Sequence, residues 1–155
     1  MHKPAKENAR LEPLIGAWSM AIVMPGEKRP DELPDVGARA TFEWMDDKAF
    51  VIERWTVPVP EAPDGVAVIG WDGARRSFLQ HYFDTRGVAR VYEMSFADGV
   101  WKLERTKPDF SPFEFSQRYT GTVSSDGKRI EGTWEIANDH KTWQKDFDLI
   151  YTRVG

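Results

Sequence analysis

The sequence contains no cysteine, so neither a disulfide nor thiolate chemistry can be part of this protein. No apolar run approaches the roughly 18 residues that a membrane-spanning helix needs, and residues 1–8 contain no apolar stretch typical of a signal peptide. The sequence contains 21 Lys and Arg residues and 25 Asp and Glu residues, which gives a formal net charge of −4 at pH 7. Basic residues are therefore not in excess. Phosphate backbones attract basic surfaces, so this balance disfavours nucleic acid. We expect a soluble, cytoplasmic protein without a nucleic-acid or membrane partner.

Motifs for common chemistries are also absent. The sequence has no phosphate-binding glycine loop, no dinucleotide-binding fingerprint and no nucleophile motif. Its three histidines do not have the spacing of metal ligands. We therefore predict no catalytic residue, no metal site and no cofactor. Enzymatic activity stays open, with binding favoured.

The length of the chain is typical of one domain with a sizeable core. We expect residues 1–155 to form a single domain. Within it, residues 1–10 are expected to be flexible and residues 11–15 to form a short helical turn.

Aromatic residues are abundant, with seven Trp, nine Phe and four Tyr. Such residues favour β-strands and fill cores. From residue 113 to residue 153, apolar and polar residues alternate, which predicts strands with one buried and one solvent-exposed face. The predicted strands are 17–24, 36–44, 48–57, 66–71, 76–83, 88–96, 99–106, 113–124, 129–137 and 143–153.

Short turns connect most of the predicted strands. Asp72-Gly73, Asp98-Gly99 and Asp126-Gly127 are typical of β-hairpins, which join antiparallel neighbours. No segment between strands has a sustained helical period, so a parallel sheet with crossover helices is not expected. An open sheet would leave two exposed edges, which a barrel removes. We predict an all-β fold, a single antiparallel up-and-down β-barrel of about ten strands, with a flattened clam or a two-sheet sandwich as alternatives.

Two connections are long and rich in proline, namely residues 24–35 and 58–65. Long loops of this kind act as lids or binding loops, or they are variable surface. We expect the loop 24–35 to lie near the mouth of the barrel.

Several polar residues share the apolar faces that would line the barrel. A few polar groups in an apolar cavity are typical of a small-molecule pocket. The alternative is that these groups pair with one another or lie at the rims, as we expect for Arg90 and Lys145. The polar residues on these faces are Arg90, Tyr92, Gln117, Tyr119, Lys145 and Tyr151. The predicted ligand-binding residues are Tyr82, Tyr92, Gln117, Tyr119, Trp134 and Phe147.

In two predicted strands the pattern does not decide which face points into the barrel. In strand 48–57, Glu53 and Arg54 are adjacent, so one of them points inward, and we expect an ion pair with a neighbouring strand. In strand 76–83, either of two alternating sets points inward. These sets are Phe78, Gln80 and Tyr82, or Leu79, His81 and Phe83. We expect a structural role for His81, because a single strand histidine has no metal-binding partner here.

The two ends of the chain resemble those of lipocalins and related calycin barrels. Gly16-Ala17-Trp18 follows the predicted turn and resembles the Gly-x-Trp of that superfamily. In lipocalins an arginine of the last strand packs across this tryptophan, and Arg153 holds the corresponding position. The resemblance implies that Trp18 and Arg153 close one end of the barrel, where the guanidinium stacks on the indole and reaches nearby carbonyls.

Most of the chain also resembles an uncharacterised bacterial family of lipocalin-like barrels. The shared features are a Leu-x-x-Leu-x-Gly-x-Trp opening at residues 11–18, Gly70-Trp71-Asp72, and a closing hairpin at residues 139–143. This resemblance brings no established activity. The hairpin is also similar to the Asp-box of sialidase propellers, which implies a turn stabilised by Asp139 and no sugar chemistry.

More distant resemblances are to fatty-acid-binding proteins and to the heme-binding nitrobindins. Nitrobindins are ten-stranded barrels whose axial histidine comes from the end of the chain. Strand 143–153 contains no histidine, and His140 falls in a turn. The sequence therefore disfavours heme.

We expect reversible binding of a small, mostly apolar or aromatic ligand inside the barrel, by a monomer or a homodimer. The alternatives are a cofactor-free enzyme of the cyclase or isomerase type, and a barrel plugged by its own side chains. The enzyme would use Tyr82 or Tyr119 with Glu53 or His81. A dimer would use an outer apolar stripe that includes Leu79, Phe83, Val91 and Ile150.

Overall fold

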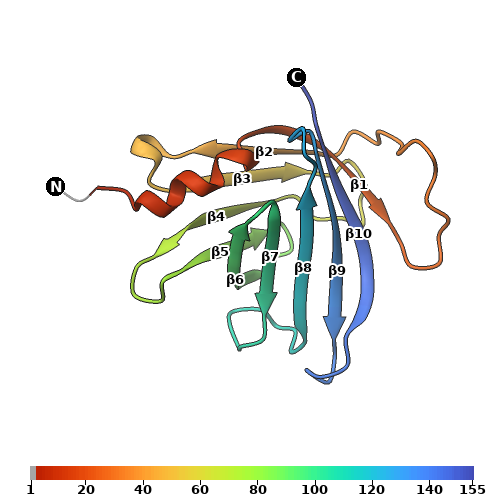
Figure 1. The fold of residues 1–155 in the computed structure, drawn as a ribbon. Helices are drawn as coiled ribbons and strands as arrows, with labels where there is room; N and C mark the ends of the chain where they lie inside the picture. Colours follow the sequence, from red (N-terminus) through yellow and green to blue (C-terminus); the bar gives the residue numbers. More distant parts are fainter. Residues whose placement is uncertain (1–2) are drawn as a thin grey trace.

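A computed structural model describes residues 3–155, and these form a closed antiparallel barrel of ten strands. Each strand pairs with the next along the chain, and the pairing of β1 with β10 closes the barrel (Figure 1). The predicted all-β, up-and-down barrel is therefore confirmed. The strands are β1 (Gly16–Val23), β2 (Arg39–Trp44), β3 (Val51–Thr56), β4 (Gly65–Asp72), β5 (Ser77–Asp84), β6 (Ala89–Ala97), β7 (Val100–Arg105), β8 (Ser116–Val123), β9 (Arg129–Ala137) and β10 (Gln144–Arg153).

Three strands begin three residues later than their sequence pattern predicts. Strand β2 begins at residue 39 and not 36, β3 at 51 and not 48, and β8 at 116 and not 113. Before β8, Arg105 donates to the carbonyl oxygens of Phe113 (2.7 Å) and Phe115 (2.8 Å). A side chain thus takes up backbone acceptors that a longer strand would use, and Phe113 is exposed. Before β3, residues Asp46–Lys48 form the short 3₁₀ turn η2.

The N-terminal helical turn is longer than expected. The 3₁₀ helix η1 spans Lys6–Leu14, so it also includes residues 6–10, which belong to the segment 1–10 predicted to be flexible. That flexibility stays a prediction. Residues 1 and 2 lie outside the described residues. Asn8 is buried, where its Nδ2 donates to the carbonyl of Ala49 (2.8 Å) and its Oδ1 accepts from the amide of Trp71 (3.2 Å). Asn8 therefore fixes η1 to one end of the barrel, where Leu11 and Leu14 join the core.

The same end carries the contact that the lipocalin resemblance implies. The Arg153 guanidinium carbon lies 4.1 Å from the ring centre of Trp18, and the two residues are register partners in β10 and β1. Arg153 donates to the carbonyl oxygens of Ile15 (2.6 Å) and Pro13 (2.9 Å), while the Trp18 indole donates to that of Leu14 (2.9 Å). These bonds satisfy carbonyls at the end of η1, which have no partner within the helix. We call this the closed end.

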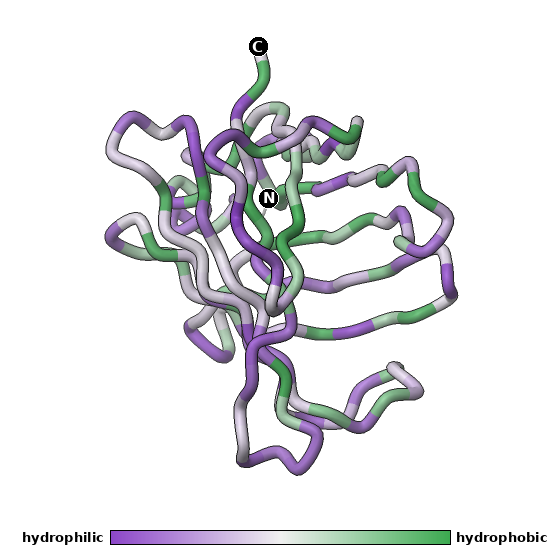
Figure 2. The backbone as a smooth tube through the Cα atoms, turned by 90° about the vertical axis from the view of Figure 1, so that its right-hand side faces the viewer, coloured by the Kyte–Doolittle hydropathy of each residue, from purple (hydrophilic) through white to green (hydrophobic). Residues whose placement is uncertain are grey.

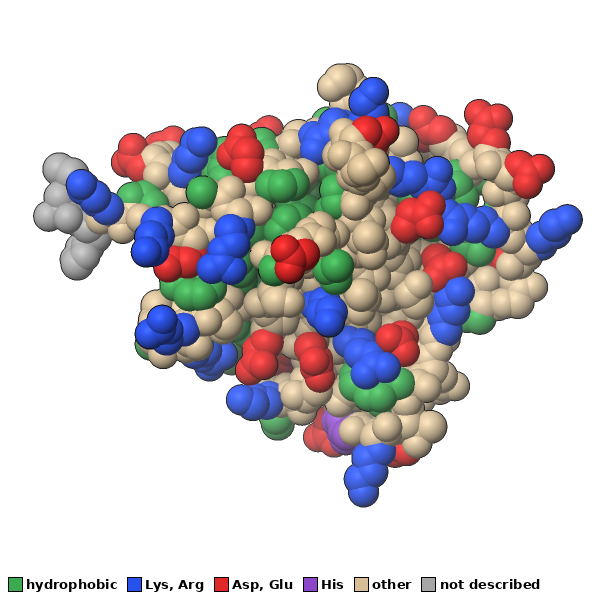
Figure 3. All heavy atoms as spheres, in the orientation of Figure 1, with side chains coloured by type: hydrophobic (Ala, Val, Ile, Leu, Met, Phe, Trp, Pro, Cys, Tyr) green, Lys and Arg blue, Asp and Glu red, His purple; other side chains and the backbone are tan. Residues whose placement is uncertain are grey.

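The outer surface is mostly polar. Hydrophilic and hydrophobic residues alternate along the strands (Figure 2), and acidic and basic side chains are interspersed over the face seen in Figure 3. The predicted outer apolar stripe is not continuous, because Ile150 is 1% exposed while Phe83 is 50% exposed. The oligomeric state remains a prediction.

Candidate functional site

The barrel encloses a cavity of about 530 Å³. It extends from the middle of the strands to the end opposite η1, because its lining includes residues at the β1–β2 and β3–β4 loops. Pro34 and Val36 come from the first loop, and Val59 and Pro63 from the second. The two long proline-rich loops therefore form part of the mouth. The lining is mainly apolar and aromatic, as is usual for small-molecule sites.

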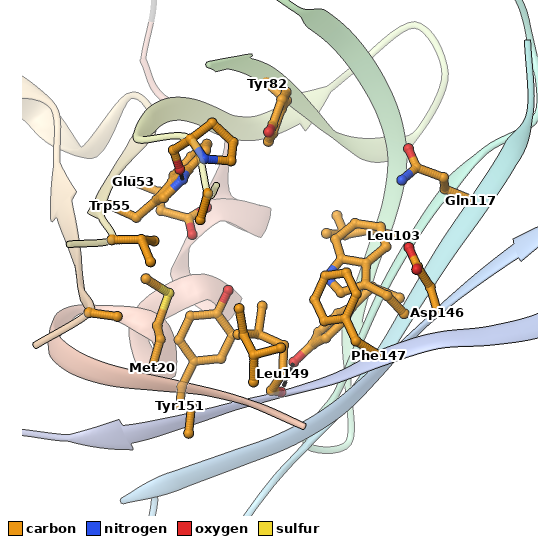
Figure 4. A pocket seen from close by; sticks show the side chains of 18 of the residues that line it. Met20, Glu53, Trp55, Tyr82, Leu103, Gln117, Asp146, Phe147, Leu149 and Tyr151 are labelled. Carbon is orange, nitrogen blue, oxygen red and sulfur yellow. Dashed lines mark hydrogen bonds between the residues drawn. The ribbon is translucent and has the colours of Figure 1, made fainter. Parts of the chain in front are cut away.

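All six residues predicted to bind a ligand line this cavity. They come from five strands, namely β5, β6, β8, β9 and β10. They are Tyr82, Tyr92, Gln117, Tyr119, Trp134 and Phe147. Several of their side chains point into the open space in Figure 4. Ligand binding by these residues stays a prediction.

The aromatic residues of the wall pack against each other. The ring centre of Trp134 lies 5.6 Å from that of Tyr92 and 5.2 Å from that of Tyr119. Nearer the mouth, the rings of Trp55 and Tyr82 stack at 5.2 Å. Edge and stacked contacts of this kind hold large rings in fixed positions. The wall is therefore preformed.

Some of the inward polar groups do pair with one another, as the alternative proposed. The Tyr92 hydroxyl donates to Gln117 Oε1 at 3.0 Å, and the Tyr82 hydroxyl donates to Asp84 at 2.6 Å. Burial and the bond to Asp84 raise the pKa of Tyr82. Asp84 also accepts from Arg86. These pairs hold Tyr82 and Tyr92 in place, and burial raises the pKa of both phenols.

Tyr119 lies against two glycines that face each other across β8 and β9. A Cβ atom on Gly121 or Gly132 would collide with the Tyr119 ring. The Tyr119 hydroxyl reaches over the sheet to the carbonyl of Leu149 at 3.3 Å. The glycine pair thus allows the ring to lie close to the backbone, which leaves space in the cavity.

A β-bulge in β10 corrects one part of the predicted lining. The pairing of β10 with β9 shifts register between Lys145 and Phe147. The extra residue turns Lys145 outward, where its Nζ lies 2.9 Å from Asp148, and leaves Asp146 in the cavity lining. Burial raises the pKa of Asp146. Strict alternation predicted Lys145 on the inner face, because a single inserted residue leaves no signature in the pattern.

The structure also decides which face of strand β5 is inward. Phe78, Gln80 and Tyr82 point inward, and His81 is exposed on the outside. His140 lies in the β9–β10 turn, where its Nδ1 is 2.7 Å from Ser116 Oγ. No histidine among residues 3–155 lines the cavity. The cavity therefore offers no histidine ligand for heme among the described residues, and the proposed catalytic pairing of a tyrosine with His81 does not form.

Arg90 lies at the mouth but is buried more deeply than a rim position implies. It is 7% exposed, and its guanidinium carbon lies 5.5 Å from the ring centre of Tyr82 and 5.7 Å from that of Phe115. Its Nε donates to Ser111 at 3.4 Å. Two rings and the 106–115 segment therefore cover this charge.

Glu53 is the inward member of the Glu53-Arg54 pair. It is 4% exposed and lines the cavity, whereas Arg54 is exposed outside. The expected ion pair with a neighbouring strand is wrong, since no ion pair or hydrogen bond within the described chain holds the Glu53 carboxyl. Burial alone raises its pKa to about 8.

Two further polar atoms in the cavity wall have no partner among the described residues. They are Gln80 Oε1 and Trp101 Nε1, on side chains that are 4% and 1% exposed. The sequence pattern included Gln80 in one of two alternative sets and did not single out Trp101. The sequence did contain one signal for Trp101, because Trp101 and Leu103 are two residues apart in the predicted strand 99–106 and therefore share a face. Unpaired buried groups are rare, so they mark where a ligand would contribute hydrogen bonds.

Residues 3–155 contain no group of three or more His, Cys, Asp and Glu residues that could hold a metal ion. None of the helices in this part of the chain is long and apolar enough to cross a membrane.

Comparison with known proteins shows a likeness of fold. No family model matches the chain, and no curated protein matches it. Among solved structures, the chain is similar to the crystal structure of Rv2717c from M. tuberculosis, with a TM-score of 0.59 and 16% sequence identity. The match covers 99% of this chain and 100% of that one. At this identity the likeness concerns the barrel fold and not its ligand.

Proposed function

We propose that this protein reversibly binds a small, mostly apolar or aromatic ligand inside a lipocalin-like barrel. The observation that carries the proposal is the cavity of about 530 Å³, which is open at the end that carries the two long loops. A barrel plugged by its own Trp and Phe side chains would not contain such a space. The binding residues are Tyr82, Tyr92, Gln117, Tyr119, Trp134 and Phe147.

The composition of the wall supports an apolar or aromatic ligand. Aromatic rings form most of the middle of the cavity, and they are fixed by mutual packing rather than free to fill the space. The few polar groups converge from different strands and would orient a bound molecule. The preformed wall lowers the cost of ordering side chains on binding.

The first experiment compares the mass of the purified protein under native and denaturing conditions. We expect the mass measured under native conditions to exceed the mass measured under denaturing conditions. The difference is the mass of the released molecule, which gives its chemical class. A protein purified without cargo is then titrated with 1-naphthylmethanol, followed by tryptophan fluorescence. Absence of both a cargo and any saturable binding of small aromatic or apolar molecules would contradict the proposal.

A cofactor-free enzyme is the second candidate, favoured by one observation. Glu53 is a buried carboxyl whose pKa of about 8 lies near neutrality, as is common for acid–base groups in active sites. Tyr119 and Tyr151 lie in the same cavity. If the released ligand is chemically changed on incubation with the protein, and Glu53→Gln stops the change but not binding, then the enzyme explanation holds.

A further inference from the structure

We propose that the deep part of the cavity recognises the cationic amine group of its ligand, with Glu53 as counter-ion and Gln80 as a second acceptor. This inference rests on the proposed binding function and names its ligand class, an aromatic or apolar amine. It starts from two cavity residues, Glu53 and Gln80, whose acceptor oxygens have no partner among the described residues.

The Glu53 side chain is a charge-bearing group without a counter-ion. It projects from the middle of β3 into the cavity, and its strand neighbours Phe42 on β2 and Ala67 on β4 offer neither a charge nor a hydrogen bond. Lone buried carboxyl groups are costly unless they are paired, because burial removes the water that stabilises their charge. An incoming ammonium group would supply both the positive charge and the N–H donors.

Gln80 adds a second acceptor facing the same space. Its Oε1 is buried and unpaired, and the side chain lines the cavity with Glu53. Two oxygen acceptors that both lack donors match a ligand group with several N–H bonds. A carboxylate or phosphate ligand has no N–H to offer, and it would be repelled by an ionised Glu53.

Aromatic side chains line the same cavity. The ring of Trp101 lies 5.3 Å from that of Tyr119 and 5.9 Å from that of Tyr151, between centres. Figure 4 shows the Tyr151 hydroxyl pointing toward the part of the cavity where Glu53 lies. Electron-rich ring faces attract ammonium ions, and the effect increases when water is excluded.

The cationic residues of the cavity wall do not neutralise Glu53. Arg86 and Arg90 line the mouth, where Arg86 pairs with Asp84 and Arg90 packs on Tyr82 and Phe115. Among the described residues, Asp146 is the only acidic residue that lines the cavity near its mouth. The positive charges therefore lie near the entrance, and the deep part carries a carboxyl alone.

The test uses a matched pair of molecules that differ in one group. 1-Naphthylmethylamine and 1-naphthylmethanol have the same ring and length, but only the amine carries a positive charge. Their affinities are measured by isothermal titration calorimetry at pH 7 for the native chain, for Glu53→Gln and for Glu43→Gln. Glu43 is an exposed outward residue on the neighbouring strand β2, so its variant controls for loss of one acid. Circular dichroism checks that each variant is folded.

We expect the native chain and Glu43→Gln to bind the amine at least about tenfold more tightly than the alcohol, which corresponds to about 1.4 kcal/mol. Glu53→Gln should lose this preference while its affinity for the alcohol stays within about threefold. Because Glu53 is protonated in the empty cavity, binding of the ammonium form should also release close to one proton. The binding enthalpy then depends on the ionisation enthalpy of the buffer, and this dependence disappears in Glu53→Gln.

Equal affinity of the native chain for both molecules overturns the amine inference and leaves the proposed binding function standing. A preference for the amine that survives in Glu53→Gln overturns it as well, because the counter-ion is then another group. If neither molecule binds and the purified protein carries no cargo, both the inference and the proposed function fail.

Discussion

The guanidinium of Arg153 stacks on the indole of Trp18 at 4.1 Å, although the two residues lie at opposite ends of the chain. Arg153 also donates to three carbonyl oxygens, those of Pro13, Ile15 and Gly127. A single side chain thus connects the end of η1, the first strand and the β8–β9 turn. We predict that the stability of the barrel at this end depends on Arg153.

Replacing Arg153 by Ala should lower the free energy of unfolding by about 2–4 kcal/mol, since three carbonyls lose their donor and the indole loses its cover. Urea denaturation followed by tryptophan fluorescence measures this change. Arg153→Lys should recover only part of the loss, because an ammonium lacks the planar fork. Arg54→Ala, on the exposed face of β3, is the matched control and should change stability by less than about 0.5 kcal/mol. Equal losses in the two alanine variants would contradict the closing role.

The buried Glu53 should make stability depend on pH in one direction. Its pKa is about 8 in the folded state and 4.5 ordinarily. Between these values the folded chain keeps a proton that the unfolded chain has lost, so the free energy of unfolding falls as pH rises from about 4.5 to about 8. The total loss is on the order of 5 kcal/mol at most. Below pH 4.5 this contribution is fully present.

Urea denaturation across this pH range measures the effect as a difference between the native chain and Glu53→Gln. The difference should grow in favour of Glu53→Gln as pH rises, while Glu43→Gln should follow the native chain. Parallel stability curves for native protein and Glu53→Gln would show that the carboxyl is hydrated or paired in solution.

Filling the cavity should abolish ligand binding without unfolding the barrel. Leu149 lines the cavity and is only partly buried, so Leu149→Trp places a large ring in open space. We expect at least about tenfold weaker binding of 1-naphthylmethanol, or about 1.4 kcal/mol. Leu79→Trp makes the same replacement on the outer face of β5 and should bind like the native chain. Unchanged binding by Leu149→Trp would place the ligand site elsewhere.

The contact between Gly132 and the Tyr119 ring predicts a specific sensitivity. A Cβ at position 132 collides with this ring, so Gly132→Ala should lower the free energy of unfolding by about 1–3 kcal/mol and alter the near-ultraviolet circular dichroism. Gly73→Ala, where nothing lies within 4 Å of the added Cβ, is the control. Adding Tyr119→Leu to Gly132→Ala should restore part of the lost stability. If it does not, the collision is not the cause.

Local patterning was enough to predict most of the fold. Alternation and Asp-Gly turns place ten strands, and strand 129–137 has the observed bounds. The predicted bounds of the elements are wrong where a side chain forms hydrogen bonds with backbone groups. Arg105 takes the carbonyls of Phe113 and Phe115, and Asn8 orders a helix that lacks a clear apolar period. Such long-range bonds leave no periodic signal.

The candidate site was predictable in composition but not in its polar details. Aromatic residues on alternating faces identified the wall, because the side-chain period of a strand is two. The bulge after Lys145 then exchanged Lys145 for Asp146, since one inserted residue reverses the alternation on one side of it relative to the other. The inward choice between Glu53 and Arg54 could not be made from the sequence, because Val51 and Ile52 place apolar residues on both faces of this strand.

The sequence by itself determined the class of fold, because strand alternation and turn chemistry are local properties that each short segment carries. It also indicated several of the aromatic residues that share an inner face, among them Tyr92, Tyr119 and Trp134. Only the tertiary structure decided that the interior stays open, because cavity volume depends on how rings from different strands fit together. The same holds for Glu53, Gln80 and Trp101, whose polar groups lack partners only because barrel closure buries all three against one space.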